Sequence, residues 1–137
     1  MSDSQQSLVQ YRLQQADEAL QEARILREAN HLRGALARAY YGMFHAVQSL
    51  IAHKQAEVSK HSGAIAFFDR EYVKTGIFDK QLSKWLHRMF DLRQDSDYGD
   101  MFTPSQELCD EALAHAHEFV SKIKDFKRSN HNRPLEH

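Results

Sequence analysis

The residues best suited to chemistry in this sequence lie close together, at positions 93 to 98 (Arg-Gln-Asp-Ser-Asp-Tyr). Arg93 presents a planar set of N–H donors that fits phosphate oxygens, and the hydroxyl of Tyr98 can donate to an oxyanion. Asp97 would hold Arg93 in place or position Tyr98. The alternative is structural, with Arg93 paired to Asp95 or Asp97, because an arginine that faces a core normally needs a carboxylate. Spacing alone favours the structural alternative.

A second polar set lies on a helix predicted over residues 32–53. Arg38, Tyr41 and His45 are three and four residues apart, so they share one face, roughly opposite an apolar face that includes Phe44. A histidine beside an arginine can act as a general acid or base, or donate to phosphate. The alternative is a histidine hydrogen-bonded inside a helix interface. His61, in Lys-His-Ser-Gly, is a further candidate anion contact or helix cap.

The sequence offers no recognisable metal site or nucleotide-binding loop. His115 and His117 are two residues apart and point to different sides of their predicted helix, and there is no paired cysteine. No Gly-rich phosphate loop is present, which argues against an NTPase. We therefore predict no metal and no cofactor. The single cysteine, Cys109, falls on an apolar face and is interpreted as a core residue.

Charge and hydropathy limit the partners. The formal net charge is −1, so any RNA site must be local, because no basic field covers the whole protein. No apolar run approaches the roughly 20 residues that span a membrane, so we predict no membrane contact. A lone cysteine is typical of a reducing compartment, which favours a cytoplasmic location.

Helices must position these side chains. The chain has 137 residues with only five Gly and two Pro, which suits one all-helical domain. Apolar residues recur at helical spacing in five segments: residues 7–29, 32–53, 60–74, 80–93 and 104–127. We predict an all-α fold, an antiparallel up-and-down bundle of four long helices plus a shorter one, over residues 7–127. Residues 1–6 and 128–137 are predicted to be disordered, and the last three resemble a purification-tag remnant.

Local signals predict where the helices begin, end and face inward. Ser59, Asp79 and Thr103 are predicted N-caps, and Gly76 suits the left-handed position after a helix end. Residues 94–101 are polar and are predicted to be irregular. Arg93 continues the apolar stripe of its helix and should therefore face the bundle. The inward residues of the first helix are predicted to be Leu8, Tyr11, Ala16, Ala19, Leu20, Ala23 and Leu26.

Three segments taken together resemble the successive motifs of HEPN-domain proteins, whose name abbreviates "higher eukaryotes and prokaryotes nucleotide-binding". They are residues 37–46 (Ala-Arg-Ala-Tyr-Tyr-Gly-Met-Phe-His-Ala), 60–63 (Lys-His-Ser-Gly) and 92–98 (Leu-Arg-Gln-Asp-Ser-Asp-Tyr). The three motifs in this order are more specific than any one alone. The resemblance covers residues 7–127 and is greatest to the small stand-alone prokaryotic branch of toxin–antitoxin type.

This resemblance implies a homodimer with a groove at its interface, in which some members cleave RNA without a metal. It also implies pairing with a small nucleotidyltransferase as antitoxin. The family's catalytic motif is an arginine followed a few positions later by a histidine; Arg93 matches the arginine, and Tyr98 stands where the histidine is expected, with Asp97 beside it. Our own candidates for nucleotide or phosphate contacts in such a groove are Arg38, Tyr41, His45 and His61. Because tyrosine, with a pKa near 10, is a poor base at neutral pH, cleavage is expected to be weakened or absent.

Two functions stay open at this point. The first is an RNA-associated effector or toxin component of a toxin–antitoxin module, an enzyme only if metal-independent endoribonuclease activity survives the replacement of the histidine. The second is a non-catalytic dimeric interaction module that partners a nucleotidyltransferase. Removal of the Arg93 side chain separates a role in RNA binding from a role in stability.

Overall fold

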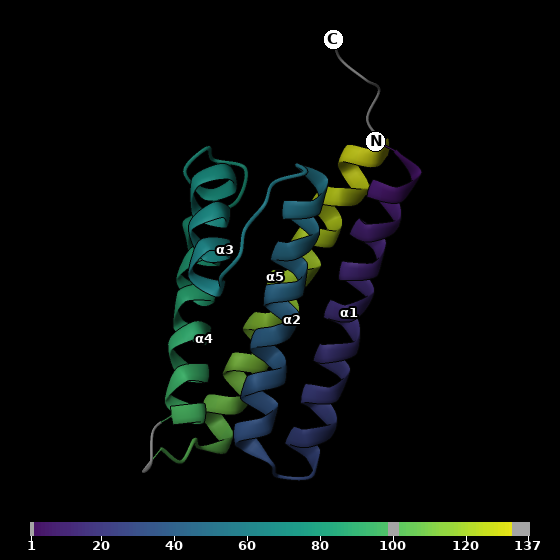
Figure 1. The fold of residues 1–137 in the computed structure, drawn as a ribbon. Coiled ribbons are helices and arrows are strands. Elements are labelled where there is room, and N and C mark those ends of the chain that lie inside the picture. The colour runs from purple at the N-terminus through teal and green to yellow at the C-terminus, as the bar shows by residue number, and fades with distance from the viewer. Residues whose placement is uncertain (1, 99–101, 133–137) are drawn as a thin grey trace.

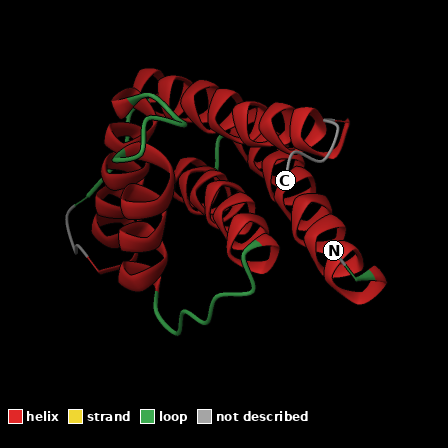
Figure 2. Ribbon diagram, turned by 90° about the horizontal axis from the view of Figure 1, so that it is seen from above, coloured by secondary structure: helices red, strands yellow, loops and turns green. Residues whose placement is uncertain are grey.

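The chain folds as a helical bundle. The computed structural model describes residues 2–98 and 102–132, and within these ranges every regular element is a helix (Figure 2). In chain order the elements are α1 (Asp3–Glu28), α2 (Leu32–His53), α3 (His61–Phe68), the π-helical turn η1 (Asp69–Val73), α4 (Lys80–Tyr98) and α5 (Gln106–Asn132). The predicted all-α bundle of four long helices and a shorter one is confirmed.

The four long helices run alternately down and up, and α2 lies at their centre (Figure 1). Helix α2 packs against α1, α3, α4 and α5. The loop over residues 54–60 runs back along the bundle, so α3 lies beside the upper half of α2 (Figure 1). This return places the first residue of α3 against the middle of α2, which is where the candidate site forms.

Helix α2 has the predicted bounds, because its apolar residues recur at helical spacing along its whole length. The face of α2 that packs in the core carries fully buried side chains, among them Leu36, Tyr40 and Met43. Gly42 lets α1 approach closely, since a Cβ atom there would stand 2.8 Å from Cδ2 of Leu20. Phe44, predicted to face the core, is only partly buried.

Helix α1 differs from its prediction at the N-terminus and on one face. Ser2 accepts a hydrogen bond from the backbone N–H of Gln5, so the helix begins at Asp3 and residues 3–6 are not disordered. Leu8 and Tyr11, predicted to face inward, are 43% and 53% exposed. Val9 and Leu13 fill the core at that end of the helix instead, whereas the rest of the predicted inner face is buried as expected (Ala16, Ala19, Leu20 and Ala23).

The third helical segment spans its predicted length, as α3 followed by the π-helical η1, but lacks its predicted cap. Lys60 is the N-cap of α3 and makes no side-chain cap bond, so the prediction of a Ser59 cap was wrong. After Phe68 the backbone widens into η1, where the N–H of Lys74 donates to the carbonyl oxygen of Asp69 at 2.8 Å. Gly76 adopts φ +83°, which confirms its predicted left-handed conformation.

Helix α4 begins as predicted but continues further. Asp79 accepts a hydrogen bond from the N–H of Gln81 at 2.8 Å and so caps the helix. The helix runs to Tyr98, so residues 94–98 are helical and not irregular. Residues 99–101 of that predicted irregular segment lie outside the described residues. The continuation matters because Arg93 stands on regular helix, where its direction is set by the packing of α4.

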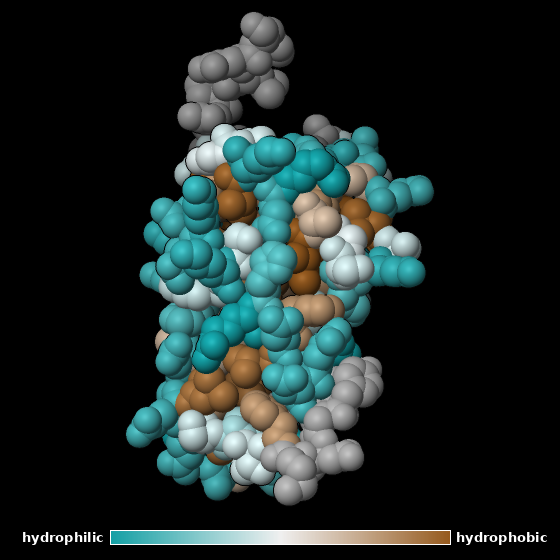
Figure 3. Space-filling model, turned by 90° about the vertical axis from the view of Figure 1, so that its left-hand side faces the viewer, coloured by the Kyte–Doolittle hydropathy of each residue, from teal (hydrophilic) through white to brown (hydrophobic). Residues whose placement is uncertain are grey.

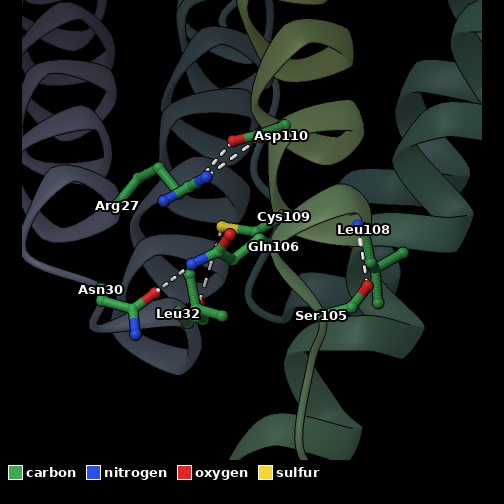
Figure 4. A network of polar contacts seen from close by, with 8 residues as sticks. All are labelled: Arg27, Asn30, Leu32, Ser105, Gln106, Leu108, Cys109 and Asp110. Atoms are coloured by element: carbon green, nitrogen blue, oxygen red, sulfur yellow. Dashed lines mark hydrogen bonds and ion pairs between the residues drawn. The ribbon is translucent and has the colours of Figure 1, made fainter.

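Helix α5 begins at Gln106 and is capped by Ser105, whose hydroxyl accepts from the N–H of Leu108 at 3.0 Å (Figure 4). The prediction of a Thr103 cap was therefore wrong by two residues. The helix continues to residue 132, so residues 128–132 belong to it and are not a disordered tail; residues 133–137 lie outside the described ranges.

Polar contacts fasten the α1–α2 turn to the start of α5. Arg27 on α1 forms an ion pair with Asp110, and Gln106 donates to the side-chain oxygen of Asn30 at 3.0 Å (Figure 4). Cys109 is fully buried against this turn, which confirms its assignment to the core. These contacts link the start of α5 to the α1–α2 turn, at one end of the bundle.

The surface over α3 and α4 is mixed in character. Hydrophobic atoms gather there in separate patches between hydrophilic side chains (Figure 3). In the described part of the chain no helix is long and apolar enough to cross a membrane.

Candidate functional site

Arg93 lies on α4 and reaches the middle of α2. Its Nη2 atom donates to the hydroxyl of Tyr41 at 2.9 Å, and its guanidinium carbon lies 5.4 Å from the centroid of the Tyr41 ring and 5.9 Å from that of Tyr40. The side chain is half-buried. Arg93 therefore faces the bundle, and two tyrosine rings present their electron-rich faces to its charge.

Tyr41 lies between two arginines. The guanidinium carbon of Arg38 is 5.0 Å from the Tyr41 ring centroid, and one of its Nη atoms is 3.7 Å from a carboxylate oxygen of Glu22 on α1. Arg38 is 41% exposed by side chain. The row Arg38–Tyr41–Arg93 therefore joins α2 and α4, with one arginine open to solvent and the other half-buried.

His61 opens α3 and meets the same tyrosines. Its Nδ1 atom is 2.8 Å from the hydroxyl oxygen of Tyr40, and its ring stacks on Phe44 with centroids 4.1 Å apart. Burial, followed by the charge of Arg93 and by His45, holds the pKa of His61 below its usual range. His61 is therefore a neutral imidazole at pH 7, fixed on the α2 surface beside Arg93.

His45 lies one turn along α2 from Tyr41 and also adjoins Phe44, with ring centroids 6.1 Å apart. Its Nδ1 atom is 2.9 Å from the side-chain oxygen of Gln48, and its ring centroid is 6.3 Å from that of Tyr41. Burial lowers its pKa; the hydrogen bond with Gln48 works against that shift, and the charges of Arg12 and Arg38 add to it. His45 is therefore also neutral at pH 7.

The structure thus brings five predicted residues into one cluster, which we call the α2–α4 cluster: Arg38, Tyr41, His45, His61 and Arg93. Asp97 and Tyr98 belong to the last turn of α4, one turn beyond Arg93, and their side chains lie outside what the structure describes. The predicted ion pair between Arg93 and Asp97 therefore stays a prediction.

Three further residues of the cluster were missed as site residues. Tyr40 and Phe44 lie on the apolar face of the central helix and were interpreted as core residues, and Arg12 was not considered. Each touches or electrostatically influences a site histidine. Two adjacent tyrosines followed by phenylalanine could have signalled an aromatic surface wider than one helix face, but the contact with His61 depends on the path of the loop over residues 54–60.

Comparison with known proteins identifies the family. A model of the HEPN domain matches residues 9–126, a range that includes every described residue of the cluster. The chain belongs to the HEPN-domain family. The resemblance predicted from the three motifs is confirmed.

Relatives of this HEPN protein are of similar length. A UPF0332 protein of Thermotoga maritima is 34% identical over 131 residues, which cover 93% of this chain and 99% of the relative. A Methanocaldococcus jannaschii protein that is named as a candidate toxin is 32% identical over 116 residues, covering 85% of this chain and 86% of the relative. A UPF0332 protein of Archaeoglobus fulgidus is 31% identical over 122 residues, covering 89% and 97%.

The α2–α4 cluster of this HEPN domain has the composition of an anion site. It combines two fixed guanidinium groups with two neutral imidazoles and flat aromatic rings, and such groups bind phosphate oxygens and stack on bases. Residues 2–98 and 102–132 contain no group of three or more His, Cys, Asp or Glu that could hold a metal ion. The described side chains of the cluster supply hydrogen-bond donors, positive charge and aromatic surfaces for stacking.

Proposed function

We propose that this HEPN protein is an RNA-associated effector of a toxin–antitoxin module, and that the α2–α4 cluster binds the phosphate backbone of single-stranded RNA. The observation that carries the proposal is the row Arg38–Tyr41–Arg93, in which two guanidinium groups flank one tyrosine ring. Relatives that are named as candidate toxins support the toxin role.

The proposed role of Arg93 is to bind a phosphodiester oxygen. Its Nη2 is already held by the Tyr41 hydroxyl, so little conformational entropy is lost when a phosphate binds. Arg38, which is more exposed, would bind a neighbouring phosphate. Because the net charge of the protein is −1, RNA binding would depend on these two phosphate contacts and not on a basic field over the whole surface. With only two phosphates neutralised, the affinity should depend only weakly on salt concentration.

Cleavage by this site is proposed to be weak or absent. Metal-independent RNA cleavage needs a group that takes a proton from the attacking 2′-hydroxyl, with a pKa near the working pH. Tyr98 stands where the family's histidine is expected, and an ordinary tyrosine pKa near 10 is too high for that role. Tyr98 would therefore contribute a hydrogen bond to the bound phosphate.

The alternative function is a non-catalytic dimeric module that binds a nucleotidyltransferase-type antitoxin. The observation that favours it is the outward face of α1, where Leu8, Tyr11 and Ile25 are 43%, 53% and 58% exposed. Leu8 and Tyr11 are neighbours one turn apart, and clustered exposed apolar side chains are typical of protein contacts. The two functions differ in whether RNA affinity depends on Arg93.

The test measures binding of a fluorescein-labelled single-stranded RNA by anisotropy for Arg93→Ala and Arg88→Ala. Arg88 is an exposed arginine of the same helix and is the matched control. We expect Arg93→Ala to weaken binding by about 10- to 100-fold, the usual worth of a hydrogen bond to a charged group, with an unchanged circular-dichroism spectrum. Equal affinities in a folded Arg93→Ala protein would overturn RNA binding at this cluster.

The catalytic part is tested by restoring the family residue. Tyr98→His restores the histidine expected from the family motif, and we expect metal-independent RNA cleavage to appear or rise in the presence of EDTA. The double variant Tyr98→His/Arg93→Ala is the control and should not cleave. If Tyr98→His binds RNA as tightly as the unmodified protein but produces no cleavage, the tyrosine is not what limits catalysis.

A further inference from the structure

The hydroxyl of Tyr40 donates its hydrogen bond to His61, as its burial and its neighbours indicate. Tyr40 is fully buried, and burial raises its pKa, so the phenol stays protonated. A buried O–H group is nearly always hydrogen-bonded, and the acceptor 2.8 Å away is Nδ1 of His61. Because Tyr40 donates, Nδ1 of a neutral His61 must be the unprotonated nitrogen, and the ring proton lies on Nε2.

The ring of His61 is also fixed in orientation. It stacks on Phe44 at 4.1 Å with planes 19° apart, and the edge of Tyr41 meets it at 6.1 Å with planes 75° apart. Among the described residues no hydrogen bond reaches Nε2. The Nε2–H group of the half-buried His61 ring is therefore the hydrogen-bond donor that is available to a ligand.

The His61 ring lies near Arg93, whose charge helps to lower the His61 pKa. Both His61 and Arg93 pack on the same two tyrosines: the His61 ring centroid is 5.6 Å from that of Tyr40, and the Arg93 guanidinium carbon is 5.9 Å from it. Two donors that share a platform, one charged and one neutral, suit one phosphate group better than two separate ligands.

We infer that His61 is a fixed hydrogen-bond donor to a phosphate oxygen at the Arg93 site, and that Tyr40 is the positioning residue that locks His61 in its Nε2–H tautomer. The inference rests on the proposed function and deepens it. It excludes His61 as the missing general base, because Nδ1 is occupied by the Tyr40 proton and Nε2 already carries one. The shared ligand chemistry is a phosphate, either in an RNA backbone or as the free anion.

The first arm of the test reads the tautomer without any activity. Long-range 1H–15N correlation spectra at pH 7.5 should show His61 with an unprotonated Nδ1 and a protonated Nε2. In Tyr40→Phe the lock is removed, and we expect a mixture of the two tautomers although the aromatic packing is retained. A protonated Nδ1 in the unmodified protein, or an unchanged tautomer in a folded Tyr40→Phe, would overturn the lock.

The second arm measures binding of the labelled RNA and, separately, of inorganic phosphate. His61→Phe keeps a ring on Phe44 but has no donor, and we expect about tenfold weaker RNA binding. His61→Gln places an amide N–H near the Nε2 position and should recover part of that loss. His117→Phe, at an exposed histidine of α5, is the matched control and should bind as the unmodified protein does.

The outcomes distinguish the two proposals. If RNA binding depends on Arg93 but is unchanged in His61→Phe, the His61 inference fails and the proposed function stands. If RNA does not bind the unmodified protein, the proposed function fails, and the donor role is then decided by whether inorganic phosphate shifts the Nε2–H resonance of His61. If inorganic phosphate but not RNA shifts the Nε2–H resonance of His61, the site binds the free anion. If neither inorganic phosphate nor RNA shifts that resonance, the inference is overturned.

Discussion

Phe44 lies at the border between the core and the α2–α4 cluster. It is partly buried, and one side of its ring is covered by His61 at 4.1 Å. The aromatic side chain therefore contributes both to packing and to the orientation of a site histidine. At the scale of single residues, the site and the core of this HEPN protein share side chains.

The first prediction compares Phe44→Ala with Phe119→Ala. Phe119 is fully buried, and its truncation should cost about 3–5 kcal/mol, whereas the partly buried Phe44 should cost about 1–2 kcal/mol. Urea denaturation monitored by circular dichroism measures both. Equal losses would mean that Phe44 is enclosed in solution, for instance by a second copy of the chain.

At the scale of elements, the contact between α2 and α5 includes a lysine at a helix end. Nζ of Lys127 on α5 donates to the carbonyl oxygen of Ser49, near the end of α2, at 3.1 Å. Burial lowers the pKa of Lys127 to about 7. Its charge therefore varies near neutral pH, whereas a lysine in the unfolded chain keeps its proton up to about pH 10.5.

The second prediction follows from this difference. Between about pH 7 and pH 10.5 the unfolded chain binds more protons at Lys127 than the folded chain does, so the free energy of unfolding should rise with pH across this window. In Lys127→Met the rise should be smaller. Urea midpoints at pH 7, 8 and 9 measure the effect, and parallel profiles for the two proteins would show that Lys127 keeps an ordinary pKa.

At the scale of the whole molecule, two surfaces are candidates for binding partners. The cluster face of α2 is already half-covered by α3 and α4, and the outward face of α1 carries exposed Leu8, Tyr11 and Ile25. Exposed apolar side chains on one long helix favour association with another protein surface. The predicted homodimer is consistent with this arrangement and stays a prediction.

The third prediction concerns this assembly. Multi-angle light scattering at micromolar concentrations should give a species of about twice the chain mass of 15.9 kDa. Leu8→Lys/Tyr11→Lys should shift the population toward the monomer if α1 supplies the interface. A mass near that of one chain at every concentration would contradict the predicted dimer. If the double variant still forms the dimer, the interface does not involve this part of α1.

Much of the fold follows from local pattern. The bounds of α2 agree with the prediction because helical periodicity depends only on residues within a few turns. Helix ends were less accurate: Ser105 caps α5 where Thr103 was predicted, because both residues can accept a cap bond and the surrounding packing selects one. On α1 the prediction failed only near the N-terminus, where Val9 and Leu13 are buried in place of Leu8 and Tyr11, because several apolar residues there compete for the inner face and tertiary packing selects among them.

The sequence by itself determined the family, the helical class and the side of α4 on which Arg93 stands. Only the tertiary structure decided what Arg93 and His61 meet. Arg93 and Tyr41 are 52 residues apart, and their hydrogen bond depends on how far α4 slides along α2. His61 meets Tyr40 because the loop over residues 54–60 returns along α2. Such contacts depend on the relative placement of whole helices, and periodicity within one helix carries no information about that placement.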